Sequence, residues 1–222
     1  MPVNRAILSQ RITEILTDIT RLSNTLYALN MTDVQRYREN YEVLSTDAAL
    51  RAEQITCRLR HLIYSTTSVG KEKYLASAAE AQGIEIAEND GILEIKLPAL
   101  LPKRRQRKST EFLLDPFMVA LSKYVEAHKM PQMSHCVICF AQIYNKNLPD
   151  RRIRDYDNLE FKQFLDVIAS YILADDNGLL LDAYNTAELG DEDCTRIFVM
   201  ESSRFKEWLD GREDTLQSIT DL

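Results

Sequence analysis

The chain has 222 residues, of which 45% are hydrophobic and 27% charged, with a formal net charge of −7. This balance is ordinary for a soluble globular protein. No run of 18 or more apolar residues occurs, so we expect no membrane span. The N-terminus also lacks the apolar stretch of a signal peptide, and we therefore expect a cytoplasmic protein.

The charge is distributed unevenly along the chain. Residues 91–165 carry 13 Lys and Arg against 8 Asp and Glu, although the whole chain is acidic. Because salt screens charges beyond about 10 Å, one locally basic region can still meet phosphate groups. The acidic net charge therefore does not exclude a nucleic-acid partner.

The N-terminal residues predict two long helices. Apolar residues recur in an unbroken 4-3-4-3 spacing that is typical of a coiled-coil-like seam: Leu8, Ile12, Ile15, Ile19, Leu22, Leu26 and Leu29. Thr32 and Gln35 match a capping box that would open a second helix, whose own seam continues to Leu62. Helices joined so closely should fold back as an antiparallel hairpin, which we interpret as a module for packing, dimerisation or binding a protein partner.

The rest of the chain predicts a mixture of helices and strands. After a linker, we expect a short helix at 71–82, then a β-hairpin at 83–98 with its turn at Asn89-Asp90-Gly91. Further expected elements are a helix at 112–128, a strand at 135–144, a helix at 157–173, strands at 179–185 and 195–201, and a helix at 203–208. The predicted organisation is an antiparallel helical hairpin over 1–66, a short helix and the start of a β-hairpin over 67–90, an α+β domain of order β-α-β-α-β-β over 91–202, and a C-terminal helix and tail over 203–222.

The four cysteines, Cys57, Cys136, Cys139 and Cys194, lack the density of a disulfide scaffold. Cys136 and Cys139 form a C-x-x-C beside His135, a pattern that can bind zinc. However, positions three apart on a strand point to opposite faces, and no second ligand pair follows at zinc spacing. We therefore expect buried thiols rather than a zinc site.

Acidic residues flank the helix predicted at 157–173. Asp155 and Asp157 share one face if their backbone is extended, and Asp175 and Asp176 follow the helix. Asp176 can reach the first pair only if the strand after the helix lies beside the strand before it. Converging carboxylates suit hydrated Mg²⁺, or Mn²⁺ in its place, which would stabilise a phosphodiester and activate a water.

Basic residues near these carboxylates are candidates for contacting DNA. Lys162 could touch the scissile phosphate or steady the leaving oxygen. Candidates for backbone phosphates are Arg151, Arg152 and Arg154, and, in a loop after the first strand of the domain, Lys103, Arg104, Arg105, Arg107 and Lys108. Plainer alternatives remain open, because acidic pairs also cap helices and form surface ion pairs, and basic runs also form solvated loops.

The segment Arg154-Asp-Tyr-Asp-Asn-Leu159, followed by Lys162, Asp166 and Asp175-Asp176, resembles the R-D-x-D-N-L…K…D…D-D pattern of RusA-type Holliday junction resolvases. The order of elements over residues 91–202 is similar as well. The resemblance implies a RusA-like fold and a homodimeric, Mg²⁺-dependent endonuclease, a hydrolase of DNA recombination and repair that nicks branched DNA. It also suggests a prophage or another mobile element as the setting.

The resemblance implies Asp155, Asp157 and Asp176 as metal ligands, with Asp175 as an alternative, and Lys162 as the catalytic lysine. The family lysine follows the second aspartate by four residues, whereas Lys162 follows Asp157 by five, which suggests a local bulge near the helix start. The minimal family also lacks the helical region before residue 83. A catalytically inactive DNA-binding or assembly protein of the same fold is the alternative function, and a coiled-coil interaction module is a third.

Overall fold

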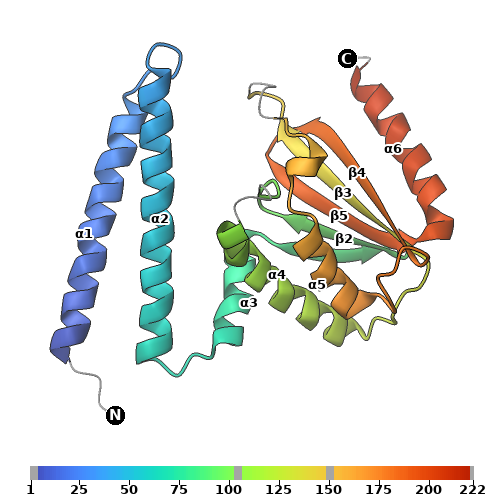
Figure 1. Cartoon of the computed structure of the whole chain (residues 1–222), viewed down its shortest axis with the longest axis horizontal. Coiled ribbons are helices and arrows are strands. Elements are labelled where there is room, and N and C mark those ends of the chain that lie inside the picture. The colour runs from blue at the N-terminus through green and yellow to red at the C-terminus, as the bar shows by residue number, and fades with distance from the viewer. Residues whose placement is uncertain (1–4, 103–106, 149–152, 221–222) are drawn as a thin grey trace. The chain divides into compact units, whose positions relative to one another are not determined.

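The computed structural model describes residues 5–102, 107–148 and 153–220, and Figure 1 shows its elements. The chain divides into two compact units, residues 1–71 and 72–222. Among the helices described, none has both the length and the apolar content that a bilayer crossing requires.

The first unit is a hairpin of two long helices, α1 (Arg5–Asn30) and α2 (Arg38–Thr66), as the sequence predicts. The predicted capping box at Thr32 is wrong, since the Thr32 hydroxyl donates back to a carbonyl of α1. Asp33 shapes the connection instead, because its carboxylate accepts two backbone N–H groups at 2.8 and 3.1 Å. The second helix therefore begins after this turn, at Arg38.

The second unit is built on one mixed sheet with the strand order β1-β2-β5-β3-β4. The strands are β1 (Glu85–Asn89), β2 (Ile92–Leu97), β3 (Cys136–Asn145), β4 (Leu181–Gly190) and β5 (Cys194–Glu201). β3 and β4 run parallel, and the other neighbouring pairs run antiparallel. The predicted turn between β1 and β2 is confirmed, with φ of 51° at Asp90 and 69° at Gly91, as a type I′ turn requires.

Helices cover both faces of this sheet. They are α4 (Arg107–His128), α5 (Lys162–Ile172) and α6 (Phe205–Thr220), while α3 (Lys71–Gln82) precedes β1 in the chain. Figure 1 shows α4 and α5 on one face of the sheet and α6 on the other. The fully buried core lies under α4 and α5 and includes Leu93, Ile95, Leu97, Phe117, Leu121, Ile138, Phe140, Phe164, Ile168, Ile197 and Val199.

The α+β class is therefore confirmed, with corrections at element boundaries. α4 begins at Arg107, so two residues of the predicted basic loop are helical. β4 continues to Gly190, past polar residues that ended the predicted strand, because an edge strand of a sheet tolerates them. α6 runs to Thr220 rather than ending at Trp208, because Phe205, Trp208 and Arg212 recur at helical spacing and pack on the sheet.

Candidate acidic site at the ends of helix α5

Asp155 and Asp157 lie in the segment between β3 and α5. Asp155 is extended, with φ −65° and ψ 141°, and a single 3₁₀ turn, Tyr156–Asn158, follows it. The α-helix predicted to start at Asp157 starts instead at Lys162. Both carboxylates are exposed, so they are open to solvent and to a ligand.

A set of hydrogen bonds fixes the backbone around these carboxylates. The Arg154 N–H donates to the Tyr144 hydroxyl at 3.1 Å, and its guanidinium Nη1 donates to the Leu101 carbonyl at 3.0 Å. Beyond the acidic pair, the Glu160 N–H donates to the Pro102 carbonyl at 2.9 Å. Asp155 and Asp157 therefore lie on a short segment that is held at both ends. The Arg154 guanidinium, a predicted DNA contact, serves at least partly as one of these anchors.

Gln142 supports this segment from within the sheet, and sequence reasoning missed it. Its side-chain oxygen accepts the Leu101 N–H at 3.2 Å and the Thr195 hydroxyl at 3.0 Å, and Gln142 and Thr195 are fully buried. These contacts tie the loop before α4 to the sheet, while the amide nitrogen of Gln142 is buried without a hydrogen-bond partner among the described residues. The available signal was one glutamine inside the apolar run of β3.

Tyr156 lies between the two carboxylates. Burial raises the pKa of the Tyr156 hydroxyl, and Tyr144 and Tyr184 add to the effect. The phenol therefore keeps its proton well above neutral pH. The groups that act on this hydroxyl, Tyr144, Tyr184 and Arg212, belong to β3, β4 and α6.

Lys162 opens α5 on a different element from Asp157. After the 3₁₀ turn, the chain is extended at Leu159, and Phe161 packs against Phe140 with ring centroids 5.0 Å apart. In place of the expected bulge, the chain therefore has a break between the 3₁₀ turn and the start of α5 at Lys162. The Lys162 ammonium is 72% exposed and pairs with Asp166 at 3.1 Å, one helical turn along α5.

Asp175 and Asp176 follow the other end of α5. The Asp175 carboxylate accepts the Asn177 N–H at 3.1 Å and its side-chain amide at 2.8 Å. The Ala174 N–H donates to the Met133 carbonyl at 2.9 Å, which places this turn just before the start of β3. Asp155, by contrast, follows the end of β3.

The structure does not bring the predicted metal ligands together within one chain. β4 does lie beside β3, as convergence would require, but the pairing is parallel and aligns Leu181 with Cys136. Asp176 is therefore at the start of β3 and Asp155 beyond its end, separated by the 11 residues of α5, or about 16 Å of helix. In the described ranges, no group of three or more His, Cys, Asp or Glu is placed to hold a metal ion.

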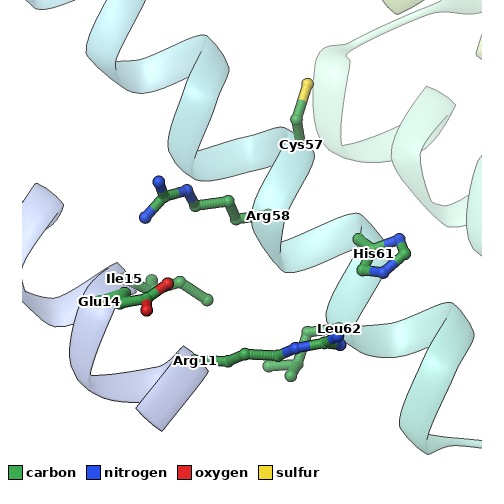
Figure 2. A pocket seen from close by; sticks show the side chains of 7 residues that line it. All are labelled: Arg11, Glu14, Ile15, Cys57, Arg58, His61 and Leu62. Atoms are coloured by element: carbon green, nitrogen blue, oxygen red, sulfur yellow. The ribbon is translucent and has the colours of Figure 1, made fainter. Parts of the chain in front are cut away.

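Most of the other predicted DNA contacts lie outside the described residues. These are Lys103, Arg104, Arg105, Arg151 and Arg152. Arg107 and Lys108 form the first turn of α4. Figure 2 shows a separate hollow in the first unit, where Arg11 and Arg58 reach across between the two helices, while Cys57 and His61 point away from α1.

The C-x-x-C cysteines are buried thiols, as expected. Cys136 is 1% exposed and Cys139 fully buried, and Cys136 belongs to the core under α4 and α5. Burial raises the pKa of the Cys139 thiol to about 12. Such a thiol stays protonated and unreactive at neutral pH.

The structure is that of an α+β protein with carboxylates at both ends of α5, the helix that connects the parallel strands β3 and β4. The chain belongs to DUF6100, described as a family of unknown function, whose model matches residues 4–222. No curated protein matches the chain. Among solved structures, the chain is similar to the periplasmic domain of Helicobacter pylori MotB, with 14% identity, a TM-score of 0.34, and coverage of 62% of this chain and 91% of that one. A similarity of this size carries no argument about function.

Proposed function

We propose that the protein is a Mg²⁺-dependent endonuclease that acts on branched DNA as a homodimer. One observation carries the proposal: exposed carboxylates flank both ends of α5, with Asp155 and Asp157 before it and Asp176 after it. The resemblance to RusA-type resolvases, which rests on these same residues, supports the reaction type.

The distance along α5 makes two copies necessary. If the α5 helices of two copies lie antiparallel across a two-fold axis, Asp155 and Asp157 of one copy meet Asp176 of the partner subunit at each end. The pair then has two equivalent carboxylate sites. A symmetric four-way junction needs two such sites to be nicked in matching strands.

Three carboxylates gathered in this way suit a hard, hydrated cation. Asp155, Asp157 and the partner's Asp176 would hold the ion, which would offset their mutual repulsion and supply an activated water for phosphodiester hydrolysis. Lys162, at the start of α5, could neutralise charge on the phosphate once it leaves Asp166.

Pairing through α5 alone would be weak. Its outward face is polar and includes Lys162, Asp166 and Ser170, so it buries little apolar surface. DNA, the metal ion or a second dimer contact would have to hold the two copies together. Any of these would raise the effective concentration of one α5 helix near the other.

Mixing two inactive variants tests both the activity and the shared site. Asp157→Asn and Asp176→Asn should each abolish Mg²⁺-dependent nicking of a synthetic four-way junction. Mixed together, they should recover nicking, because a heterodimer has one site with all three carboxylates. Asp210→Asn, an exposed carboxylate on α6, is the matched control and should leave nicking unchanged.

Two outcomes would contradict the proposal. If the natural chain nicks no junction with Mg²⁺ or Mn²⁺, the proposed nuclease activity is wrong. If both variants lose nicking and their mixture does not recover it, the site is not shared between two copies. The three carboxylates would then have to come together within one chain.

A non-catalytic DNA-binding or assembly protein is the second candidate. It is favoured by the absence of a preformed carboxylate group among the described residues and by the pairing of Lys162 with Asp166. This candidate predicts junction binding in a gel-shift assay with no cleavage under either metal.

A further inference from the structure

The hairpin uses only half of its apolar seam between its own helices. The seam positions of α1 that face α2 are all at least partly buried: Leu8, Ile15, Leu22 and Leu29. The alternate positions stay exposed: Ile12 at 41%, Ile19 at 44% and Leu26 at 48%. A helix with two apolar lines is suited to two helical neighbours, and α2 supplies one.

Polar links between the helices lie on one side of the hairpin. They join Asp18 to Arg58 at 2.7 Å, Thr25 to Asp47 at 3.0 Å and Arg11 to Ser65 at 3.5 Å. Figure 2 shows part of this side, where Arg58 and Arg11 frame a hollow of about 370 Å³. At about 100° per residue, Glu14 and Arg21 fall on the same side of α1.

The opposite side of the hairpin is apolar over its middle, and its arginines, Arg5 of α1 and Arg38 of α2, lie near its two ends. Helical geometry places there the residues that we call the apolar face: Ile12, Leu16, Ile19 and Leu26 of α1, with Ala52, Leu59 and Ile63 of α2. Leu16 is 57% exposed and Leu59 is 40% exposed. The middle of this face, between Arg5 and Arg38, can therefore be covered without removing a charge from water.

Two hydroxyl groups beside this face already have partners. Thr13 donates to the Ser9 carbonyl at 2.9 Å, and Thr20 donates to the Leu16 carbonyl at 3.0 Å. Because each hydroxyl has a partner within its own helix, burying it costs little. The surface around the apolar face is therefore suited to burial as well.

We propose that the apolar face is covered by the same face of a second copy, so that two hairpins form a four-helix bundle. Helices of 26 and 29 residues are about 40 Å long, and two of them side by side offer about 800 Å² per copy. Two such faces bury about 1,600 Å², the size of a standard stable interface. A surface of equal length with the same apolar middle is the matching partner, and a two-fold axis supplies one.

The small interior of the hairpin is a physical reason for such an interface. Its helices bury only three apolar residues among those described, Ile15, Ala48 and Ile55. A two-helix unit with so small an interior gains little stability by itself. The proposal concerns residues of the first unit alone, so it does not depend on nuclease activity.

Sedimentation equilibrium on the full chain, without DNA, tests the bundle with a matched pair of variants. Leu16→Lys changes the apolar face, whereas Leu50→Lys changes a leucine of similar exposure, 59%, on the outer side of α2. We expect the natural chain and Leu50→Lys to be dimers at micromolar concentration. Leu16→Lys should raise the dimer dissociation constant at least about 100-fold, because the two-fold axis buries two lysines.

Far-UV circular dichroism of both variants checks that the helices form. A natural chain that is monomeric at 50 µM or so would overturn the proposal, since a standard-size interface should hold at that concentration. A dimer that Leu16→Lys weakens no more than Leu50→Lys would also overturn it, because another surface would then join the copies. Neither result bears on junction nicking, which the mixed variants test separately.

Discussion

The two units of this chain reach stability in different ways. The sheet unit buries a contiguous apolar core between its sheet and the helices α4 and α5, and its largest core side chains are fully buried. The hairpin has two longer helices but a thin interior, and it joins them partly through polar links such as Asp18 to Arg58. The sheet unit therefore has a complete interior of its own, whereas the hairpin leaves a second apolar line exposed.

Comparing α1 with α5 shows what an apolar helical pattern in the sequence determines and what it leaves open. Both α1 and α5 have apolar residues at helical spacing, and both form helices. In α5 the apolar line is covered by the sheet, with Phe164, Ile168 and Ile172 buried. In α1 every second seam residue stays exposed, so periodicity gives the number of apolar lines and not the partner of each.

Removing a core ring should have the largest effect on the sheet unit. Phe164→Ala deletes a fully buried side chain that packs on Phe117 with ring centroids 5.7 Å apart. We expect a loss of about 3–5 kcal/mol in chemical denaturation, from lost burial and the cavity left behind. Leu189→Ala, at a residue 56% exposed, should change the free energy of unfolding by less than about 0.5 kcal/mol. Equal effects would show that this core does not carry the stability.

The cysteine thiols of the two units should differ in their reactivity and in the pH dependence that they give to stability. Cys57, in the hairpin, is exposed and should react with iodoacetamide at pH 8, whereas Cys139 should not. Burial raises the pKa of Cys139 from 9.0 to about 12, so its proton stabilises the fold fully below pH 9.0. That contribution is lost as the pH rises from 9.0 through about 12.

Alkaline denaturation of Cys139→Ala checks this sign. The natural chain should lose about 2 kcal/mol more than the variant between pH 8 and pH 11. Parallel pH profiles of the two proteins, or rapid alkylation of Cys139 in the folded chain, would contradict the assignment.

Gly91→Ala should have a smaller effect, confined to the β1–β2 turn. Gly91 has φ +69°, and an added Cβ would meet the Arg204 guanidinium. We expect a loss of about 1–2 kcal/mol in thermal or chemical unfolding. Gly178→Ala is the matched control, since nothing lies within 4 Å of its added Cβ, and it should be nearly neutral.

Asp18→Asn should have the smallest effect of the series, and it tests the polar side of the hairpin. The Asp18 carboxylate is 9% exposed and pairs with Arg58, so the variant should lose about 1 kcal/mol in thermal unfolding. Arg21→Gln removes the weaker contact to the same carboxylate, at 3.7 Å, from a side chain 62% exposed, and should cost less. A larger loss for Arg21→Gln would contradict this ranking of the two contacts.

Much of the fold could be predicted from local sequence patterns. The turn at Asn89-Asp90-Gly91, the helical hairpin and the buried C-x-x-C thiols follow from turn chemistry and periodicity. The start of α5 could not be predicted, because the break at Leu159 depends on Phe161 packing against Phe140, a tertiary contact.

The arrangement of the carboxylates in space also could not be predicted from the sequence. Spacing alone indicates that Asp155 and Asp176 flank one helix, and it does not determine whether β3 and β4 run parallel. Parallel pairing places the start of β4, and with it Asp176, at the start of β3, whereas Asp155 follows the end of β3. The role of Gln142 was hidden for a similar reason, because its partners Leu101 and Thr195 come from distant parts of the chain.

The most direct test of the shared acidic site is a crystal structure of the full chain soaked in Mn²⁺. The account predicts an anomalous peak at about 2.1–2.2 Å from carboxylates of Asp155 or Asp157 in one copy and of Asp176 in the partner subunit. A Mn²⁺ ion bound by the carboxylates at one end of α5 alone, or no ion at either end, would contradict it.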